Sequence, residues 1–542
     1  MPELISIVLG ILLLLLPIWA TLLDKKKSSK NLEHPPRLGE TIPFFTNGWQ
    51  FMTNKRRFIE RVKEALSQTP IVQCQLGPLK IYLITGGNNV STIFRSSFTS
   101  EPWILSILEN AAGYTPKDMS NFYADRSGAT ALPRRVSDGR PPPEKRIWYE
   151  SHRMHDETLI GARQVNAFGT SFQKFFAQEL AVFPVNEWVE NIRIADFFKS
   201  NMVAAATRAV MGPSIIDLNP DFIDTFWQYE KVPEVLAFGL PTWLNRRDVR
   251  IRDKFNSMCR KWYELADREF DLTGPDQGVD WEPVFGTQVS KGLARWAKDF
   301  NFATESIGGA FALFLYGVHA NAIPVCTWVM LELLKDPILY RAVKSEVEQA
   351  RSANQTDGIY LDQEKVTSLP LLQSVFTEVM RLHVGVLITR TSTEPVTIAG
   401  YTLPKGSVVL APTEVAHLDE SVWGKPDHPA SEFWGYRHVK EVETMNEMGH
   451  VTKALEFSIA GKSGSFFPYG GGISICTGRY FANAEVLLAI SMILSRFEVE
   501  FIEWVMPDGS HSDRPALDDI EYANAVASPP DRDMKVRWRK MW

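Results

Sequence analysis

The segment that most constrains this 542-residue chain is one long apolar stretch, Ser306 to Pro337, with helical periodicity. Its side chains are hydrophobic on nearly every face, so a helix here must be buried all round. A membrane span is the alternative, but His319, Asn321 and Pro324 lie in its middle, where polar groups are costly in a bilayer. The segment therefore predicts a central helix inside a large, mainly helical core.

The proline in this segment has a local consequence. Pro324 has no N–H, so the carbonyl of Ala320 loses its usual donor and the helix is expected to bend. A carbonyl freed inside a core needs water or a ligand as its partner. Because His319 and Asn321 flank the same turn, we expect a small polar molecule to bind beside it.

A second apolar stretch lies at the N-terminus. Leu4 to Leu23 contains no charged residue, and at about 1.5 Å per residue it can cross the ~30 Å hydrocarbon layer of a bilayer. A secretory signal peptide is the alternative, but the stretch lacks a basic start and a convincing cleavage site. Lysines follow it directly at 25–27 and 30, which predicts that the rest of the chain faces the cytosol.

The remaining organisation is simple. We predict a membrane anchor over residues 1–23, a basic linker containing Pro35 and Pro36 over 24–45, and one large domain over 46–542, which is mainly α with a small β portion. Short β-prone runs occur at 71–77 and 80–86. The net charge of −6 and the pI near 6.0 give no support for nucleic-acid binding.

One cysteine has unusual surroundings. Among four scattered cysteines, which show no disulfide framework, Cys476 follows three glycines, Gly470 to Gly472, and precedes a helix-forming run. Consecutive glycines are expected where side chains cannot fit, so a flat or bulky group is predicted against this backbone. A helix N-terminus favours a thiolate. A small buried hydrophobe is the alternative, and a zinc site lacks the necessary partners.

Three charged residues upstream complete an ordered set. Glu378 and Arg381 are three residues apart, so a helix places them on one face where they can pair. Arg437 follows in "SEFWGYRHV", and Cys476 comes about forty residues later. Alone, each signal is weak, since such pairs are usually surface features. Their order is what makes them informative.

Together these residues resemble the cytochrome P450 family of haem-thiolate monooxygenases along essentially the whole chain. The family's cysteine motif is matched by Tyr469, Gly472, Cys476, Gly478, Arg479 and Ala482, and its other two motifs by Glu378-x-x-Arg381 and Phe433-x-x-x-Arg437. The resemblance implies the P450 fold and haem b, iron protoporphyrin IX, with Cys476 as the axial thiolate ligand of the iron.

The resemblance also implies roles for the neighbouring residues. Glu378, Arg381 and Arg437 would form a buried structural cluster. Tyr469, Gly472, Gly478 and Arg479 would contact the cofactor, and Arg390 would bind a haem propionate. Two positions depart from the family pattern, because Tyr469 replaces the usual Phe and Ser474 replaces the usual Arg or His. His152, Arg153 and His155 are further candidates for the propionates, with a solvated basic face as the alternative reading.

The central helix departs from the family as well. Ala320 and Asn321 stand where the family usually has an acid followed by threonine, the pair that relays protons to iron-bound oxygen. The run "GVHANAIP" resembles the subgroup that contains the bile-acid-forming sterol hydroxylases and prostacyclin synthase. Proton delivery is then expected through Asn321, water and the free carbonyl of Ala320, with His319 a core histidine rather than an acid catalyst.

The implied activity is insertion of one oxygen atom from O2 into a lipophilic substrate, a terpenoid, sterol or polyketide-like molecule, in fungal biosynthesis. Electrons would come from NADPH through a separate NADPH-cytochrome P450 reductase, because no Gly-x-Gly-x-x-Gly nucleotide motif is present. The expected location is the endoplasmic reticulum membrane, single-pass, with the catalytic domain in the cytosol. Glu234 to Leu244 is apolar enough to contact the bilayer, although a packed loop is equally compatible.

Two alternatives stay open. The first is an isomerase or dehydratase of the same fold that acts on a peroxide or epoxide without reductase, a reading that Ala320 and Asn321 keep open. The second is a non-catalytic, membrane-tethered haem carrier.

Overall fold

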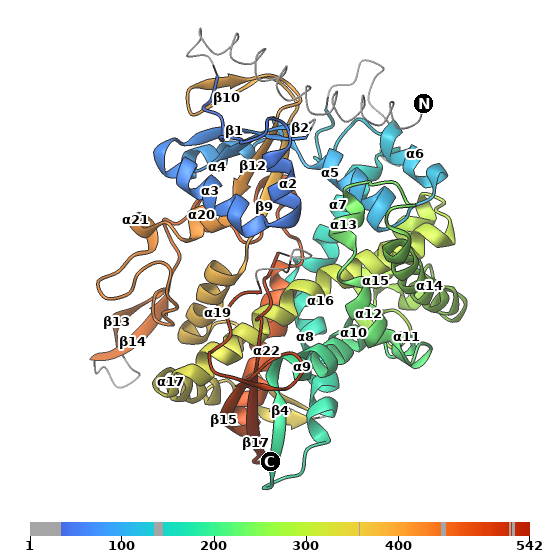
Figure 1. Cartoon of the computed structure of the whole chain (residues 1–542). Coiled ribbons are helices and arrows are strands. Elements are labelled where there is room, and N and C mark those ends of the chain that lie inside the picture. The colour runs from blue at the N-terminus through green and yellow to red at the C-terminus, as the bar shows by residue number, and fades with distance from the viewer. Residues whose placement is uncertain are drawn as a thin grey trace, which may run out of the picture. The chain divides into compact units, whose positions relative to one another are not determined.

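The computed structural model describes residues 34–77, 79–134, 142, 145–356, 358–445, 451–519, 522 and 526–542. The predicted anchor, 1–23, and residues 24–33 of the predicted linker, 24–45, lie outside these residues. The described chain forms two compact units, coloured along the chain in Figure 1. Of the described residues, unit 1 comprises those within 34–100, 386–424 and 462–474, and unit 2 comprises those within 101–385, 425–461 and 475–542. Each unit is described by itself.

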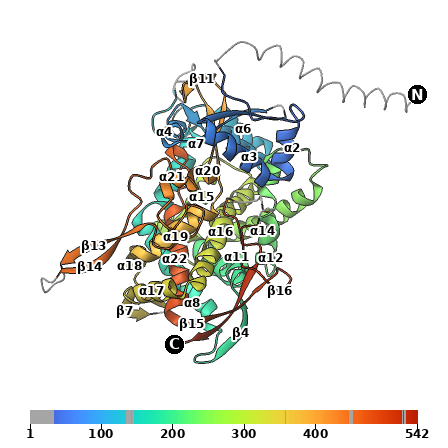
Figure 2. The ribbon, with the colours of Figure 1, turned by 60° about the vertical axis from the view of Figure 1, so that its left-hand side comes forward.

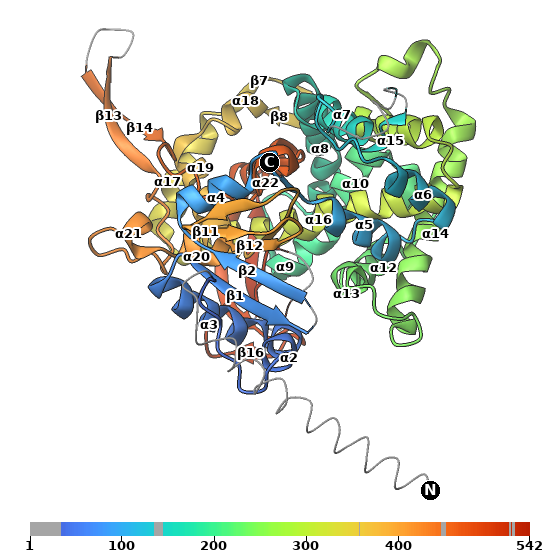
Figure 3. The same cartoon turned by 90° about the horizontal axis from the view of Figure 1, so that it is seen from above.

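Unit 1 is built on a five-stranded sheet with the order β1-β2-β12-β9-β3. Its strands are β1 (Ile71–Leu76), β2 (Leu79–Ile84), β3 (Phe98–Thr99), β9 (Leu387–Ser392) and β12 (Val408–Pro412). The two β-prone runs form the antiparallel pair β1 and β2, in which Ile71 lies opposite Ile84. Seen from above, β2 lies between β1 and β12, which pairs with it in parallel (Figure 3).

The other elements of unit 1 are short. They are α2 (Thr46–Thr53), α3 (Lys55–Gln68), α4 (Gly87–Ile93), α20 (Thr413–His417), α21 (Glu420–Trp423), the hairpin β10 (Val396–Ile398) and β11 (Tyr401–Leu403), and the 3-10 turn η5 (Gly472–Ser474). Alternate side chains of the sheet, including Ile71, Tyr82, Ile388 and Val409, form one buried hydrophobic cluster. Val72, Ile81, Leu83 and Leu410 belong to a second cluster that includes Phe58 of α3.

Unit 2 holds most of the helices. They are α5 (Glu101–Ser106), η1 (Ile107–Ala111), α6 (Pro116–Ala124), α7 (Ile147–Leu159), α8 (Ala162–Ala181), α9 (Ile194–Phe197), η3 (Phe198–Met202), α10 (Val203–Met211), α11 (Ser214–Asp217), α12 (Phe222–Tyr229), α13 (Pro233–Ala237), α14 (Arg246–Glu269), η4 (Pro275–Gly278), α15 (Gln288–Asp299), α16 (Thr304–Lys335), α17 (Pro337–Glu348), α18 (Gln363–Val366), α19 (Pro370–His383) and α22 (Arg479–Arg496).

The strands of unit 2 lie at its periphery. β4 (Trp188–Arg193), β15 (Phe497–Val505), β16 (His511–Ser512) and β17 (Asp533–Lys540) form a sheet with the order β16-β15-β17-β4, and three two-stranded pairs are β5 (Trp281–Glu282) with β6 (Gly286–Thr287), β7 (Arg351–Thr356) with β8 (Ile359–Leu361), and β13 (Val439–Met445) with β14 (Val451–Phe457). Figure 2 shows the β13–β14 hairpin extending away from the helices of this unit.

The predicted central helix is α16, and it lies in the core of unit 2. α16 contacts α14, α19 and α22 and continues through Pro324 without interruption (Figure 1). Within the part of the chain that the structure describes, it is the one helix long and apolar enough to cross a membrane. Because 67% of its most apolar stretch is buried inside the structure, α16 is a core helix, as predicted. Its observed bounds lie two residues before the predicted ones at each end.

Candidate active site

The structure brings Glu378, Arg381 and Arg437 together in unit 2. Glu378 and Arg381 lie one turn apart on α19, and both side chains are fully buried. Arg381 donates from Nε to Oε2 of Glu378 at 2.8 Å and from Nη2 to Oε1 at 2.7 Å, a bidentate arrangement. Arg437 donates from Nε to Oε1 at 2.7 Å. The carboxylate is thus matched by two guanidinium groups.

The cluster has a fourth member that the sequence did not reveal. His438 lies with its Nε2 3.0 Å from Oε2 of Glu378. Burial alone would raise the pKa of Glu378, but hydrogen bonds from Arg381 and His438 outweigh burial and lower this pKa to about 2. Arg437 also donates to the carbonyls of Pro429 and Glu432, so the cluster fixes the backbone that leads into it. No spacing rule points to His438, because its contact is purely tertiary.

Cys476 lies just before α22 and has surroundings unlike those of the other cysteines. Cys74, Cys259 and Cys326 are buried, whereas Cys476 is exposed. Protein atoms around the sulfur raise the pKa of Cys476, while the N–H groups of Gly478 and Arg479 and the charge of Arg479 oppose that rise. The expected thiolate-favouring groups are present, but desolvation is larger, so the pKa is raised rather than lowered. Gly478 is the N-cap of α22.

The glycines before Cys476 have a partner within unit 1. A Cβ on Gly471 would lie 2.6 Å from the ring of Phe94, and one on Gly472 would lie 2.3 Å from the carbonyl oxygen of Phe94. Gly472 also has a φ of +66°, a conformation that favours glycine. The sequence predicted a flat group against this backbone, and the structure places the protein's own Phe94 there. Tyr469, directly before the glycines, is half-buried.

Arg390 lies on β9 of unit 1 as a buried cation, with 8% of its surface exposed. Its Nη2 donates to the carbonyl of Gly471 at 3.2 Å, and its guanidinium lies over the ring of Phe94. Burial lowers the pKa of Arg390 to about 10, and the described residues place no carboxylate within ion-pair distance of it. A carboxylate ligand would balance this charge, so Arg390 fits the propionate role. Ser474, which replaces the usual cation, bonds instead to Ser100, with 2.7 Å between the hydroxyl oxygens.

One face of α16 is open although most of the helix between its two ends is buried. Leu313, Phe314, Gly317, Val318 and Asn321 are partly or fully exposed, and their spacing places them on one side of the helix. A Cβ added to Gly317 would meet no atom within 4 Å. We call these five residues the open face of α16. It is mainly apolar and ends at Asn321.

Asn321 is held by backbone groups near the C-terminus. Its Oδ1 accepts hydrogen bonds from the N–H groups of Val526 at 3.1 Å and Ala527 at 3.0 Å. Two N–H donors fix which end of the amide is oxygen, so only the NH2 group is left to act elsewhere. Ala320, beside it, is buried. The sequence gave no signal for residues 526 and 527 as partners.

His319 is a core histidine, as expected. It is fully buried, its Nε2 lies 2.9 Å from the hydroxyl of Thr207, and its ring packs edge-on against Phe226. Burial lowers the pKa of His319 to about 3. A histidine this hard to protonate is a poor source of protons near neutral pH.

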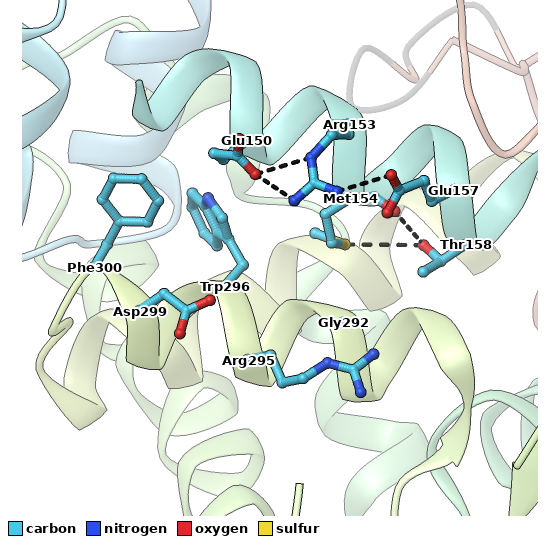
Figure 4. A pocket seen from close by; sticks show the side chains of 10 residues that line it. All are labelled: Glu150, Arg153, Met154, Glu157, Thr158, Gly292, Arg295, Trp296, Asp299 and Phe300. Carbon is cyan, nitrogen blue, oxygen red and sulfur yellow. Dashed lines mark hydrogen bonds and ion pairs between the residues drawn. The ribbon is translucent and has the colours of Figure 1, made fainter. Parts of the chain in front are cut away.

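The three weaker candidates lie on α7. Arg153 is paired with Glu150 and Glu157, and His152 lies 3.1 Å from Asp156. His155 contacts the carbonyl of Ser151 at 2.7 Å. Figure 4 shows Arg153 between its two carboxylates at the edge of an open cavity of about 630 Å³ between α7 and α15. These contacts favour the solvated-face reading for Arg153.

The sequence of the chain is similar to known proteins. The family model for cytochrome P450 matches residues 211–513. A cytochrome P450 monooxygenase of Penicillium decumbens, calL, is 40% identical over 94% of each chain. A cytochrome P450 monooxygenase of Humicola fuscoatra, fsoE, is 26% identical over 89% of this chain and 85% of its own. Cholesterol 7-alpha-monooxygenase of Cricetulus griseus is 29% identical over 42% of this chain and 43% of its own.

The fold gives an independent match. The crystal structure of the heme domain of a mutant cytochrome P450DA superimposes with a TM-score of 0.61 at 15% identity, covering 94% of this chain and 98% of that one. The mostly helical fold with a small β portion, predicted from the sequence, is therefore confirmed. The chain belongs to the cytochrome P450 family, as an oxidoreductase of the monooxygenase class whose cofactor is haem b with a cysteine thiolate as axial ligand.

Proposed function

We propose that this chain is a membrane-anchored monooxygenase that inserts one oxygen atom from O2 into a lipophilic substrate, a terpenoid, sterol or polyketide-like molecule of fungal secondary metabolism. The observation that carries the proposal is Cys476. Of the four cysteines it is the exposed one, and it lies directly before the N-terminus of α22 within the family's cysteine motif. Cys476 is thus the residue that would hold the iron.

The other residues would support the cofactor in different ways. Glu378, Arg381 and Arg437 would stabilise the fold around it, and Arg390 would bind a propionate, because it is a buried cation without an anion among the described residues. Gly478 and Arg479 would direct N–H groups at the thiolate. When bound, the haem supplies the iron at which O2 is activated with electrons from the reductase.

Asn321 would act through its NH2 group. Because its carbonyl oxygen already accepts two backbone N–H groups, Asn321 can donate hydrogen bonds at the end of the open face but has no free acceptor there. We therefore revise the proton route. Asn321 would hold a water molecule by donation, and the carbonyl of Ala320, which lacks its usual partner because of Pro324, would accept from that water.

The membrane and the reductase are part of the same proposal. Phe238, Leu240, Trp243 and Leu244, between α13 and α14, are 44% to 66% exposed, which supports a contact of this loop with a bilayer. The anchor, Leu4 to Leu23, would fix the chain to the endoplasmic reticulum membrane in a single pass with the catalytic part in the cytosol. Electrons would come from NADPH through cytochrome P450 reductase.

The test is the carbon-monoxide difference spectrum of the reduced protein, followed by NADPH consumption with a reductase. We expect a Soret band at the thiolate position in the wild type and in Cys74→Ala, a matched control at a buried cysteine. Cys476→His should lose the thiolate band. A thiolate band that persists in Cys476→His would refute the ligand assignment.

A second candidate is an isomerase or dehydratase acting on a peroxide or epoxide. Ala320 and Asn321 favour it, because neither side chain is an acid or an alcohol that could pass on a proton. The two candidates differ in their need for electrons. Turnover of a lipid peroxide without NADPH and reductase, with no product formed in their presence from O2, would favour the isomerase.

A further inference from the structure

A buried carboxyl group, Glu230, lies near the central helix and forms no ion pair with the described residues. Glu230 follows α12 and is 2% exposed. Its Oε1 accepts a hydrogen bond from the hydroxyl of Tyr522. Within the described ranges, no Lys, Arg or His lies at ion-pair distance from Glu230. A carboxyl group this buried is costly as an ion unless something else compensates it.

The Glu230–Tyr522 pair lies near Tyr316, a half-buried residue of α16 beside the open face. Tyr316, which directly precedes Gly317, lies with its ring edge-on to that of Tyr229, with 6.4 Å between the centroids. Tyr316 is close enough to Glu230 and Glu234 for their charges to raise its pKa further after burial has raised it. Four and five residues after Tyr522 in the sequence, Val526 and Ala527 donate their N–H groups to Asn321, the last residue of the open face.

The chemistry of Glu230 and Tyr522 suits a ligand with a neutral polar group. Burial raises the pKa of Glu230, which favours the protonated carboxylic acid over the carboxylate. A protonated carboxyl group and a phenol can each donate and accept. An alcohol on a ligand has the same two capacities, whereas an ammonium group would require the ionised form of Glu230.

We propose that Glu230 and Tyr522, with Tyr316 beside them, form a polar subsite that hydrogen-bonds a hydroxyl group of an otherwise apolar substrate lying along the open face of α16. This inference rests on the proposed function and narrows its substrate to lipophilic alcohols. The apolar residues Leu313, Phe314 and Val318 contact the hydrocarbon part, and the subsite holds the hydroxyl end. The position of oxidation is then set by the length between the hydroxyl group and the reacting carbon.

The experiment measures binding to the haem-loaded enzyme by the substrate-induced shift of the Soret band. The probes are farnesol, cholesterol and 1-dodecanol, each tested beside its methyl ether. For at least one pair, the wild type should bind the alcohol about tenfold more tightly than the ether, the loss expected for one buried hydrogen bond. Tyr522→Phe and Glu230→Leu should reduce that ratio to about twofold.

Two further variants separate recognition from packing. Glu230→Gln keeps a donor and an acceptor and should recover most of the preference. Tyr360→Phe is the matched control, since it removes a buried tyrosine hydroxyl that donates to the carbonyl of Met492 at 3.1 Å. It should lower the melting temperature and leave the alcohol-to-ether ratio unchanged.

Three outcomes would overturn the subsite. They are no alcohol preference in any pair, a preference that survives in both Tyr522→Phe and Glu230→Leu, and equal weakening of alcohol and ether in those variants. All measurements use protein whose carbon-monoxide spectrum shows the thiolate band. A wild type without that band refutes the proposed function, whereas a wild type with the band and without alcohol preference refutes this inference alone.

Discussion

Glu378 and Glu485 are both buried carboxyl groups of unit 2, and their surroundings are opposite. Glu378, on α19, is bound by Arg381, Arg437 and His438, and its pKa is lowered to about 2. Glu485, on α22, is 1% exposed, and its Oε1 has no hydrogen-bond partner among the described residues. Burial raises the pKa of Glu485 well above its usual value.

The difference shows two ways to bury an acid. Glu378 stays ionised because cations and N–H donors replace its water. Glu485 avoids the cost of a buried charge by keeping its proton. In the first arrangement the carboxylate holds several segments together. Its removal would leave Arg381 and Arg437 buried without an anion. The second leaves a neutral group whose loss matters little. The predictions below test this contrast.

The largest effect is expected for Glu378→Ala. Removing this carboxylate leaves Arg381 and Arg437 buried without their anion, which costs about 3–5 kcal/mol of the free energy of unfolding. We expect loss of soluble, haem-loaded protein, measured as purified yield and by urea unfolding. The control is Glu157→Ala, which removes a 59% exposed carboxylate paired with Arg153. It should change the free energy of unfolding by about 0.5 kcal/mol or less. A stable, haem-loaded Glu378→Ala protein would show that the folded protein does not need this carboxylate.

The second prediction concerns acid. The pKa of Glu378 falls from 4.5 to about 2 on folding, so its contribution is fully present above pH 4.5 and is lost as the pH falls toward 2. The shift corresponds to about 3 kcal/mol in all. The free energy of unfolding of the wild type, measured in urea between pH 6 and pH 3, should fall steadily below pH 4.5. A flat profile across this interval would show that folding does not lower the pKa of Glu378.

Arg390→Gln should act on cofactor binding more than on folding. This change removes a buried cation that has no carboxylate partner in the described residues, so the unfolding free energy of the haem-free protein should change little. Loss of a propionate partner should weaken haem binding about tenfold, which is about 1.4 kcal/mol. Haem transfer to apomyoglobin measures that loss, with Arg390→Lys as the variant that keeps the charge. Unaltered haem retention in Arg390→Gln would remove Arg390 from the propionate role.

The smallest effect is expected for Glu485→Gln. Because an amide resembles the protonated acid, stability at pH 5 should change by about 1 kcal/mol or less. The raised pKa of Glu485 means that its favourable contribution is complete below pH 4.5 and is lost as the pH rises. The variant should therefore gain stability relative to the wild type between pH 5 and pH 9, as thermal melts would show. A loss of several kcal/mol at every pH would mean that Glu485 is ionised and paired.

Local spacing made parts of this site predictable. Glu378 and Arg381 are one helical turn apart, so a short motif was enough to predict their pairing. The burial of α16 was predictable because its residues are apolar on nearly every face. The cysteine motif is likewise contiguous in sequence.

Tertiary partners were not predictable. Phe94 against Gly471, His438 on Glu378, and Val526 and Ala527 on Asn321 join segments far apart in the chain. A phenylalanine or a backbone N–H carries no mark of its distant partner, since the contact depends on how the segments pack. The expected proton route through Asn321 therefore did not include the fact that its Oδ1 already accepts two backbone N–H groups.

Gly317 gives this enzyme a way to acquire new specificity. It lies in a regular helix, and the space beyond its Cα is empty, so alanine or a larger residue can be accommodated there without displacing a neighbour. Replacing a helical glycine by alanine also gains about 0.5–1 kcal/mol from the backbone. Most mutations that reshape an active site reduce stability, which limits how many a lineage can accumulate. At this position a change of shape and a gain in stability coincide, so under the proposed binding mode natural or laboratory evolution can alter substrate preference here without losing stability.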